Sequence, residues 1–371
     1  MNRTSLAVLA LITALVVIAA VVSYSRRQSE PASPGSEHLY PALEDHVNDV
    51  ASITIRTGDG EFMISRHEGD WGLQTKGGYP VSFEKVKQTI LGLADLRIIE
   101  PKTSRPEYYD RLGVNEPGPD AEAVLITLND AAGDALASLV IGDPAGASGR
   151  VPRRFVRKID QARAWLVQGQ LTVHERPLDW VEREILRLPR TRVQSVTITH
   201  PDGERIHLQR DDQSRRNFAV DDVPEGYELQ SDAIANPIAN ALGFLRMEDV
   251  APIDEIDFAP GEVATVEFRC FNGLLVTLEL LPTDEGAWIE LCASADGDAV
   301  PAEPEPDVET PPDTAATQAG EINDRVTGWA FRISQSTVNI LLKRMSDLTR
   351  PVEPEPDQPQ DNGGTEEVDA G

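Results

Sequence analysis

Residues 50–55 read VASITI and are followed by Asp-Gly-Glu at 59–61, and residues 193–198 read VQSVTI and are followed by Asp-Gly-Glu at 202–204. Each copy is rich in β-branched residues, alternates polar with apolar side chains from its serine onward, and then reaches an Asp-Gly pair, which is the signal of two antiparallel strands joined by a tight turn. A repeat over this distance indicates two similar structural units. The sequence therefore predicts a duplication in which each unit begins with a β-hairpin.

The similarity between the two copies continues beyond the hairpins. Ser82 and Ser231 each precede a pattern of helical periodicity and are placed to cap a helix. The two patterns end alike, with Leu-x-x-Leu-Arg at 93–97 and again at 242–246. Pro237 lies inside the second pattern, so it should kink that helix or mark its first turn. The order strand, turn, strand, helix is thus expected in both units.

A length of 371 residues fits two domains with appendages. We predict an α+β fold with two tandem duplicated β-rich units, in which antiparallel hairpins are covered by helices, after an N-terminal transmembrane helix. The first unit is expected over residues 48–190, with a short helix at 178–186 near its end, and the second over residues 191–350. Residues 294–323 and 351–371 are acidic, rich in Pro and without Lys or Arg. Their composition predicts a disordered insertion in the second unit and a disordered tail.

The N-terminal segment is strongly apolar. Residues 6–22 carry no charge, and with their neighbours they reach about 20 residues, enough for a helix that crosses a bilayer core of about 30 Å. A cleaved signal peptide with a small-x-small site at 23–25 is the alternative, although its apolar core is usually shorter. We predict a transmembrane anchor over residues 1–25 and a stalk over 26–47. Arginines flank both ends of the apolar run, so the positive-inside rule does not fix the orientation; we expect a single pass of the inner membrane and a periplasmic body.

The formal net charge of -28 argues against a nucleic-acid partner, whose phosphates require basic side chains. The chain has two cysteines, Cys270 and Cys292. If the strands between them form a meander, the two residues lie two strands apart, roughly 9 to 10 Å, which is too far for a disulfide. A different topology would permit the bridge, so the cysteines leave the redox compartment open.

A Gly-rich stretch at residues 142–149 is a candidate phosphate-binding loop, because backbone N–H groups in such turns bind anions. It lacks the Gly-Lys-Ser/Thr ending of such loops and precedes a strand pattern, which favours a hairpin loop. Ser148 is not part of a Gly-x-Ser-x-Gly motif, so we do not expect it to be a nucleophile.

The six histidines include no pair at the spacing of helical metal ligands. His200 and His207 flank the second hairpin and are expected at the surface. The paired carboxylates of Asp221 and Asp222 fit a solvated face, since acids are frequent in this chain. The two Asp-Gly pairs are expected to serve as turns. We therefore predict no catalytic, cofactor-binding or metal-binding residues.

The order of several motifs resembles a known bacterial family. After the N-terminal apolar helix come a strand pair, Asp-Trp-x-Leu at 70–73, the Leu-x-x-Leu-Arg at 93–97, Leu-Gly at 112–113 and Leu-x-Ile-Gly-Asp at 139–143. This order resembles the DUF4340 family of domains of unknown function, over roughly residues 1–350. Members are often encoded beside gliding-type ABC transporter components. The resemblance implies an envelope-associated accessory of a transport system, without catalytic residues.

From the anchor, the duplicated body and the resemblance, we expect a membrane-anchored, non-enzymatic accessory or binding subunit of a cell-envelope complex. The expected partners are the membrane and ABC transporter subunits, and no cofactor is expected. Two alternatives remain open from the sequence. One is an envelope hydrolase or ligand-binding enzyme with a site between the two units, and the other is a structural spacer.

Overall fold

The computed structural model describes residues 37–119, 121–146, 151–259, 261–296 and 314–352. The chain divides into two compact units, residues 1–182 and 183–371, and its described part consists mostly of antiparallel β-sheet with few helices, in agreement with a β-rich α+β fold. The predicted anchor at 1–25 lies outside the described residues, as does the stalk up to residue 36. The stalk prediction is wrong for residues 37–47, because Leu39 and Leu43 are buried in the first unit and Leu43–His46 form helix α2. Within the described ranges, no helix is long and apolar enough to cross a bilayer.

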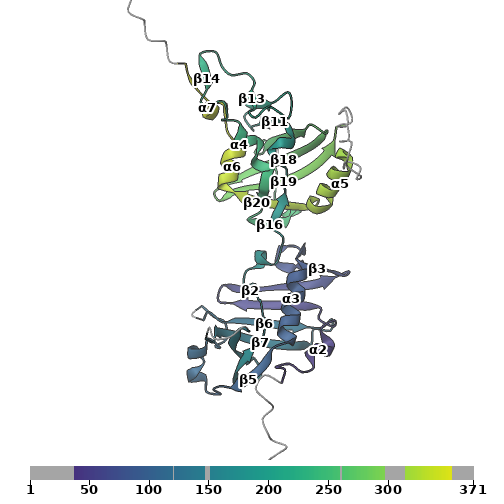
Figure 1. Ribbon diagram of the computed structural model, residues 1–371, viewed down its shortest axis with the longest axis vertical. Coiled ribbons are helices and arrows are strands. Elements are labelled where there is room, and N and C mark those ends of the chain that lie inside the picture. The colour runs from purple at the N-terminus through teal and green to yellow at the C-terminus, as the bar shows by residue number, and fades with distance from the viewer. Residues whose placement is uncertain (1–36, 120, 147–150, 260, 297–313, 353–371) are drawn as a thin grey trace, which may run out of the picture. The chain divides into compact units, whose positions relative to one another are not determined.

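The first unit is built on one nine-stranded sheet (Figure 1). Its strands are β1 (Ser52–Thr57), β2 (Gly60–His67), β3 (Asp70–Leu73), β4 (Tyr79–Pro80), β5 (Arg97–Pro101), β6 (Val124–Asn129), β7 (Ala135–Pro144), β8 (Arg153–Lys158) and β9 (Ala164–Gln168), and its helices are α2 (Leu43–His46) and α3 (Phe83–Ala94). The strand order is β4-β3-β2-β1-β6-β7-β8-β9-β5, and each described pair is antiparallel.

The predicted hairpin is confirmed in this unit. Strands β1 and β2 pair from Ser52↔Ser65 to Thr57↔Gly60, and Gly60 has a φ of 145°, which favours glycine. Ile53 and Ile64 face each other across the pair, and both are fully buried. The alternation of residues therefore places one face of the hairpin against the core, and α3 runs across this sheet (Figure 1).

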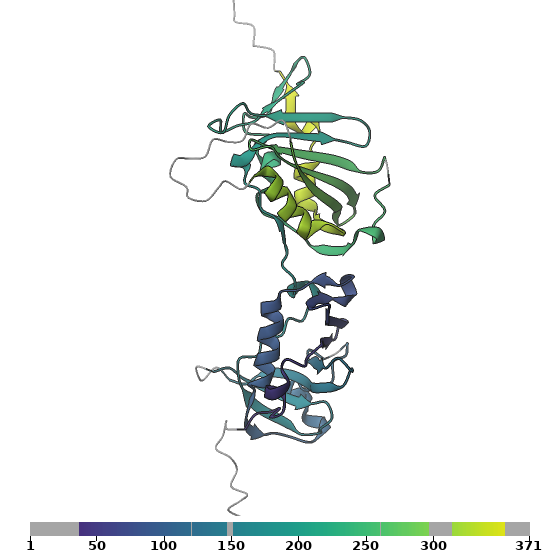
Figure 2. The ribbon, with the colours of Figure 1, turned by 90° about the vertical axis from the view of Figure 1, so that its right-hand side faces the viewer.

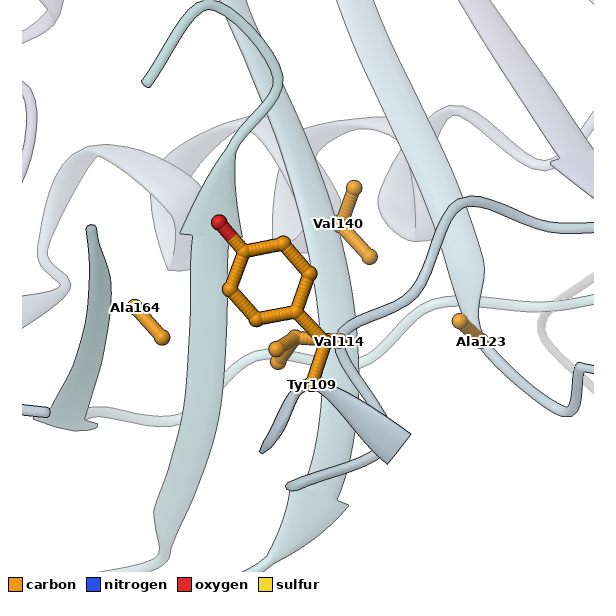
Figure 3. Packing of buried hydrophobic residues seen from close by; sticks show 5 residues of the cluster. All are labelled: Tyr109, Val114, Ala123, Val140 and Ala164. Atoms are coloured by element: carbon orange, nitrogen blue, oxygen red, sulfur yellow. The ribbon is translucent and has the colours of Figure 1, made fainter. Parts of the chain in front are cut away.

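The other face of the first sheet is covered in part by an irregular segment. Two short 3₁₀ turns, Pro106–Tyr108 and Asp110–Leu112, bring Tyr109 over the strands. The buried cluster consists of Tyr109, Val114, Ala123, Val140 and Ala164 (Figure 3). The Tyr109 hydroxyl donates to the carbonyl of Ala162, so the polar end of the ring is satisfied where the ring is buried.

The second unit has an eight-stranded antiparallel sheet and two small strand pairs. Its strands are β10 (Glu184–Leu186), β11 (Val193–Thr199), β12 (Arg205–Gln209), β13 (Ala219–Val220), β14 (Tyr227–Leu229), β15 (Leu245–Arg246), β16 (Asp249–Pro252), β17 (Ala264–Cys270), β18 (Leu274–Thr283), β19 (Gly286–Ala295), β20 (Trp329–Ser334) and β21 (Thr349–Pro351); its helices are α4 (Asn236–Ala239), α5 (Ala315–Val326), α6 (Gln335–Leu341) and α7 (Met345–Leu348). The large sheet has the order β13-β12-β11-β17-β18-β19-β20-β16. Helices α5 and α6 pack on β19 (Figure 2).

The helix predicted at residues 178–186 is wrong. The chain there forms a 3₁₀ turn, Pro177–Asp179, and then β10, which pairs with β15 of the second unit. Trp180, Val181, Ile185 and Leu186 are all buried, and pairing of Glu184 with Arg246 and of Leu186 with Leu245 holds the stretch extended. The boundary between the units consequently lies at residues 182/183, where the predicted one was 190/191.

The long helix predicted after Ser231 is also wrong. Helix α4 spans only Asn236–Ala239, with Pro237 in its first turn, and a 3₁₀ turn, Ala241–Phe244, follows. Proline fixes φ and has no N–H to donate, so it is tolerated at a helix start and not further inside. Of the two roles considered for Pro237, the structure shows the first-turn role.

The prediction of a disordered insertion over residues 294–323 is wrong at both ends, since β19 reaches Ala295 and α5 begins at Ala315. Residues 297–313 lie outside the described residues, whereas Ala315–Val326 form α5. The Thr314 hydroxyl accepts a hydrogen bond from the backbone N–H of Thr317 at 3.1 Å, which caps this helix. Ala319, Ile322 and Val326 are buried on one face. The acidic composition of the whole stretch concealed this short apolar periodicity.

Two motifs of the first unit touch although they are distant in sequence, because Gly142 lies against Leu112 and Gly113. A Cβ atom at Gly142 would lie 2.3 Å from the carbonyl oxygen of Leu112. We therefore expect Gly142→Ala to lower the free energy of unfolding by about 3 kcal/mol, since backbone atoms would have to move. Urea unfolding measures this change. Gly118→Ala is the matched control, because a methyl group at that position would meet nothing within 4 Å, and an equal effect of both variants would contradict the expectation.

Candidate functional site: an apolar groove beside helix α3

Helix α3 positions the candidate site. It begins after Ser82, which occupies the N-cap position as predicted, but the Ser82 side chain makes no capping hydrogen bond. Val86, Ile90 and Leu93 are buried at helical spacing and face the sheet. The buried hydroxyl of Thr89 donates to the carbonyl of Thr172 at 3.0 Å, which holds the helix against the segment after β9. The sheet and this segment thus fix the orientation of α3.

Two large apolar side chains of α3 remain exposed. Phe83 is 63% exposed and Leu91 is 46% exposed. They are eight residues apart, about 12 Å along a helix axis, and Lys87 lies midway between them on the same side of the helix. Phe83, Lys87 and Leu91 form what we call the exposed stripe of α3. The buried stripe explains how α3 packs on its sheet, but it does not explain why these two apolar residues face solvent.

A groove of about 190 Å³ lies beside the exposed stripe. Its walls come from the segment after α2, from β2 and β3, and from α3 itself. It is lined by Val47, Asn48, Val50, Arg66, Trp71, Phe83, Val86, Lys87, Ile90 and Leu91. We call it the α3 groove. A cavity of about 150 Å³ holds one benzene-sized group, so the α3 groove has room for one or two apolar side chains.

The charged residues of the α3 groove are both basic. Arg66 is exposed and forms no ion pair within the described part of the chain. Lys87 lies 3.9 Å from a carboxylate oxygen of Glu84, at the outer limit for a salt bridge. Pairs this exposed contribute little to stability, so both cations are available to a ligand. The groove therefore combines an apolar floor with positive charge at its rim.

The opposite side of the exposed stripe is more polar. A shallow hollow of about 530 Å³ lies there, and Lys87 and Leu91 line both depressions. The other residues lining this hollow are Glu84, Gln88, Gly92, Asp95, Gln170 and Thr172. Two carboxylates in this set make it an unfavourable place for an anionic ligand. The two sides of the stripe thus differ in charge.

The sequence did not reveal the α3 groove. Its lining residues come from four separate segments, and only the fold brings them together. One signal was present: Leu91 lies off the buried stripe of Val86, Ile90 and Leu93. Phe83 is on the same face as Ile90, seven residues away, and is exposed because it is the first residue of the helix. Exposed apolar residues that gather beside an apolar groove form a patch, and patches of this kind mark interaction sites.

The candidate phosphate loop does not form a site in the described residues. Strand β7 extends to Pro144 and is followed by Ala145, whose N–H donates to the carbonyl of Arg153 at 2.9 Å. This contact is that of a hairpin, as predicted. Ser148 lies outside the described residues. Gly142 is required for the close approach of Leu112, which is a structural role.

The two histidines of the second hairpin occupy different environments. His200 is only 5% exposed, so the prediction of a surface histidine is wrong; its Nε2 lies 3.3 Å from the carbonyl oxygen of Lys343, in the segment that leads to α7. His207 forms a hydrogen bond with the Thr197 hydroxyl at 3.0 Å. Among the residues with described positions, no three His, Cys, Asp or Glu side chains gather in a way that could hold a metal ion.

The second Asp-Gly-Glu turn has a structural role. Gly203 has a φ of 90°, as a tight turn requires. Arg344 forms salt bridges with Asp202 and Glu204, and Glu204 also accepts the backbone N–H of Met345 at 2.9 Å. The backbone N–H of Glu204 and the Arg344 guanidinium lower the pKa of Asp202, because both stabilise its charged form. This turn therefore anchors the start of α7.

The cysteines are not bridged. Cys270 on β17 is buried, Cys292 on β19 is exposed, and β18 lies between the two strands, as in the predicted meander. Burial raises the pKa of the Cys270 thiol to about 11. The pKa of the Cys292 thiol is raised as well, first by desolvation and then by the negative charges of Glu290 and Glu279.

These shifts predict slow alkylation, because the thiolate is the reactive form and a raised pKa reduces its fraction. At pH 8, we expect iodoacetamide to label Cys292 more slowly than a cysteine in an unfolded peptide and to label Cys270 only after denaturation. Mass spectrometry over time measures both rates. Glu290→Gln should accelerate labelling of Cys292, whereas rapid labelling of Cys270 in the folded chain would contradict its burial.

A comparison with protein families matches residues 71–262 to the family described as Domain of unknown function (DUF4340). No curated protein and no solved structure matches the chain. The matched region starts at Trp71, in the wall of the α3 groove, and includes α3 and the Leu112, Gly113 and Gly142 contact. It covers more than half of the 371 residues, although less than the resemblance over residues 1–350 had suggested. The chain belongs to the DUF4340 family.

Proposed function

We propose that this protein is a membrane-anchored, non-enzymatic accessory or binding subunit of a cell-envelope complex. The α3 groove is the observation that carries the proposal. The side chains of Phe83 and Leu91 expose apolar surface to solvent beside a groove with an apolar floor. Exposed apolar sites of this kind mark places where other molecules bind. Trp71 and Val86 are buried in the groove walls and give it a packed base.

The proposed anchor is the apolar run at residues 6–22, with the body on the periplasmic side of the inner membrane. The length of this run and the absence of charge support it. A pair of reporter fusions after Gly371 tests the orientation, one active only in the periplasm and one active only in the cytoplasm. Activity of the cytoplasmic reporter alone would show that the body faces the other way.

We also propose that the two units arose by duplication. The repeated hairpin sequence supports this, and so does the order of the strands. If β4 is set aside, β3-β2-β1-β6-β7-β8-β9-β5 of the first sheet corresponds, position by position, to β13-β12-β11-β17-β18-β19-β20-β16 of the second. Superposition of the eight strand pairs tests the proposal. Corresponding strands that differ in direction would refute it.

ABC transporter subunits are the partner class that we propose. Family membership supports this, since DUF4340 members are expected beside transporter components. The test is co-purification of the full chain from its native membranes in a mild detergent. We expect a membrane protein to remain bound through size-exclusion chromatography. A chain that elutes alone under conditions that preserve known membrane complexes would refute the proposed function and would favour a structural spacer.

A further inference from the structure

We infer that the α3 groove binds an acidic amphipathic helix of a partner protein. This inference rests on the proposed function, because it names the kind of segment that the binding subunit would hold. Three features of the groove support it: the backbone that the groove offers, the spacing of its apolar residues and the charge of its rim.

The groove offers no strand edge. Trp71 lies on β3, which is hydrogen-bonded to β2 on one side and to β4 on the other. Val47, Asn48 and Val50 belong to an irregular segment, and the remaining residues of the lining are on β2 and α3. The backbone N–H and C=O groups of an extended ligand would have no free strand edge to form hydrogen bonds with in the groove. A helix satisfies these groups internally, so it can bind through side chains alone.

The apolar residues have the spacing of a helix-packing surface. Phe83 and Leu91 are about 12 Å apart along α3, and Val86 and Ile90 form an i, i+4 row on the groove side. A partner helix laid along α3 would place apolar side chains at i, i+4 and i+7 or i+8 against this surface. Helix α3 has 12 residues, about 18 Å in length, so the contact would involve about three turns of the partner.

The charges at the rim select an acidic partner. Arg66 on β2 and Lys87 on α3 both line the groove. Both can pair with carboxylates that flank the apolar stripe of the bound helix, which would favour the correct register and speed encounter. Arg66 has no internal carboxylate to compete with such a partner among the described residues.

Two other occupants fit the groove less well. An anionic bilayer surface would meet Glu84 and Asp95 on the opposite side of the stripe, and the chain as a whole has a formal charge of -28. The chain's own acidic tail carries Pro354, Pro356 and Pro359. Proline is unfavourable inside a helix, so the sequence around these prolines is poorly suited to a helical ligand.

Photo-crosslinking of the full chain in its native membranes tests the inference. Phe83→p-benzoylphenylalanine and Leu91→p-benzoylphenylalanine place the probe on the stripe, and Tyr108→p-benzoylphenylalanine is the control on an exposed residue outside the groove. Mass spectrometry of the cross-linked peptides identifies the segment bound. We expect both stripe probes to react with one partner segment that has a net negative charge and apolar residues at i, i+4 and i+7 or i+8.

Charge reversal provides a second readout. Arg66→Glu with Lys87→Glu should reduce the yield of this cross-link by about tenfold, whereas Arg105→Glu with Arg163→Glu, both exposed and outside the groove, should change it by less than about twofold. Circular dichroism shows whether each variant is folded. A rescue of the yield by Lys substitutions at the acidic residues of the partner segment would support direct pairing.

The outcomes separate the inference from the proposed function. Cross-links to lipid, to the acidic tail, to a second copy of this chain or to an uncharged or basic segment would overturn the inference, as would an unchanged yield after charge reversal. If a membrane partner co-purifies but the probes give any of these results, the proposed function stands and the inference fails. If no membrane partner co-purifies and neither stripe probe cross-links to a protein, both fail.

Discussion

Replacement of Arg210 by Met is expected to lower the free energy of unfolding of the second unit by about 3 to 4 kcal/mol. Arg210 is only 5% exposed, and its guanidinium donates to several backbone carbonyls at distances from 2.6 to 3.3 Å. The acceptors are the carbonyls of Val193, Gln213, Arg215, Arg190 and Thr191. The rings of Phe218 and Phe271 also contact the guanidinium, with centroids 5.0 and 5.1 Å from Cζ.

The size of this effect follows from the hydrogen bonds of Arg210, which Met cannot form. Methionine fills a similar volume but donates no hydrogen bond, so carbonyls at the start of β11 and in the loop after β12 would lose their donor. Urea unfolding followed by circular dichroism measures the loss as a lower midpoint of the affected transition. Arg205→Met is the matched control, since Arg205 is an exposed residue of β12, the strand that Arg210 directly follows, and its effect should stay within about 0.5 kcal/mol. Equal midpoints for the two variants would contradict the structural role of Arg210.

The second large effect concerns binding. Phe83→Asp combined with Leu91→Asp is expected to reduce partner affinity by about 100-fold or more, because central aromatic and apolar anchors of an interface often contribute about 2 kcal/mol each. Both side chains are exposed in the isolated chain, so the thermal midpoint should change little. The partner retained in the proposed co-purification is titrated against each variant to obtain the two affinities.

Tyr108→Asp is the control for this experiment. Tyr108 is an exposed aromatic residue of the same unit and does not line the α3 groove. Its substitution should leave affinity within about twofold of the wild-type value. Unchanged affinity of the Phe83 and Leu91 double variant, with the fold intact, would show that the partner binds elsewhere.

Local periodicity predicted many of the individual elements. The alternation from Ser52 to Thr57 and from Val193 to Thr199 predicted the first strand of each hairpin. The helical spacing of apolar residues after Ser82 predicted the packed face of α3. These predictions succeed because one strand or helix carries its own pattern of buried residues. The register of β17, β18 and β19 then explains why Cys270 and Cys292 cannot meet, as the predicted meander required.

Predictions that depended on distant partners were less successful. Glu184–Leu186 has too few residues to carry a pattern, and only pairing with β15 makes it a strand. Arg210 precedes two aspartates and has the local sequence of an exposed polar loop, yet its bonds to backbone carbonyls accompany its burial. The α3 groove likewise requires residues from four segments. Such features depend on tertiary contacts, which a single sequence does not display.

We propose that this protein holds a membrane partner through the α3 groove. Affinity isolation of the full chain from native membranes, with quantification of bound proteins, tests it most directly. We predict that the wild-type chain retains one membrane protein in near-stoichiometric amount and that the chain with Phe83→Asp and Leu91→Asp loses it, while the chain with Tyr108→Asp keeps it. A wild-type chain that purifies alone, or a double variant that keeps the same partner, would contradict the claim.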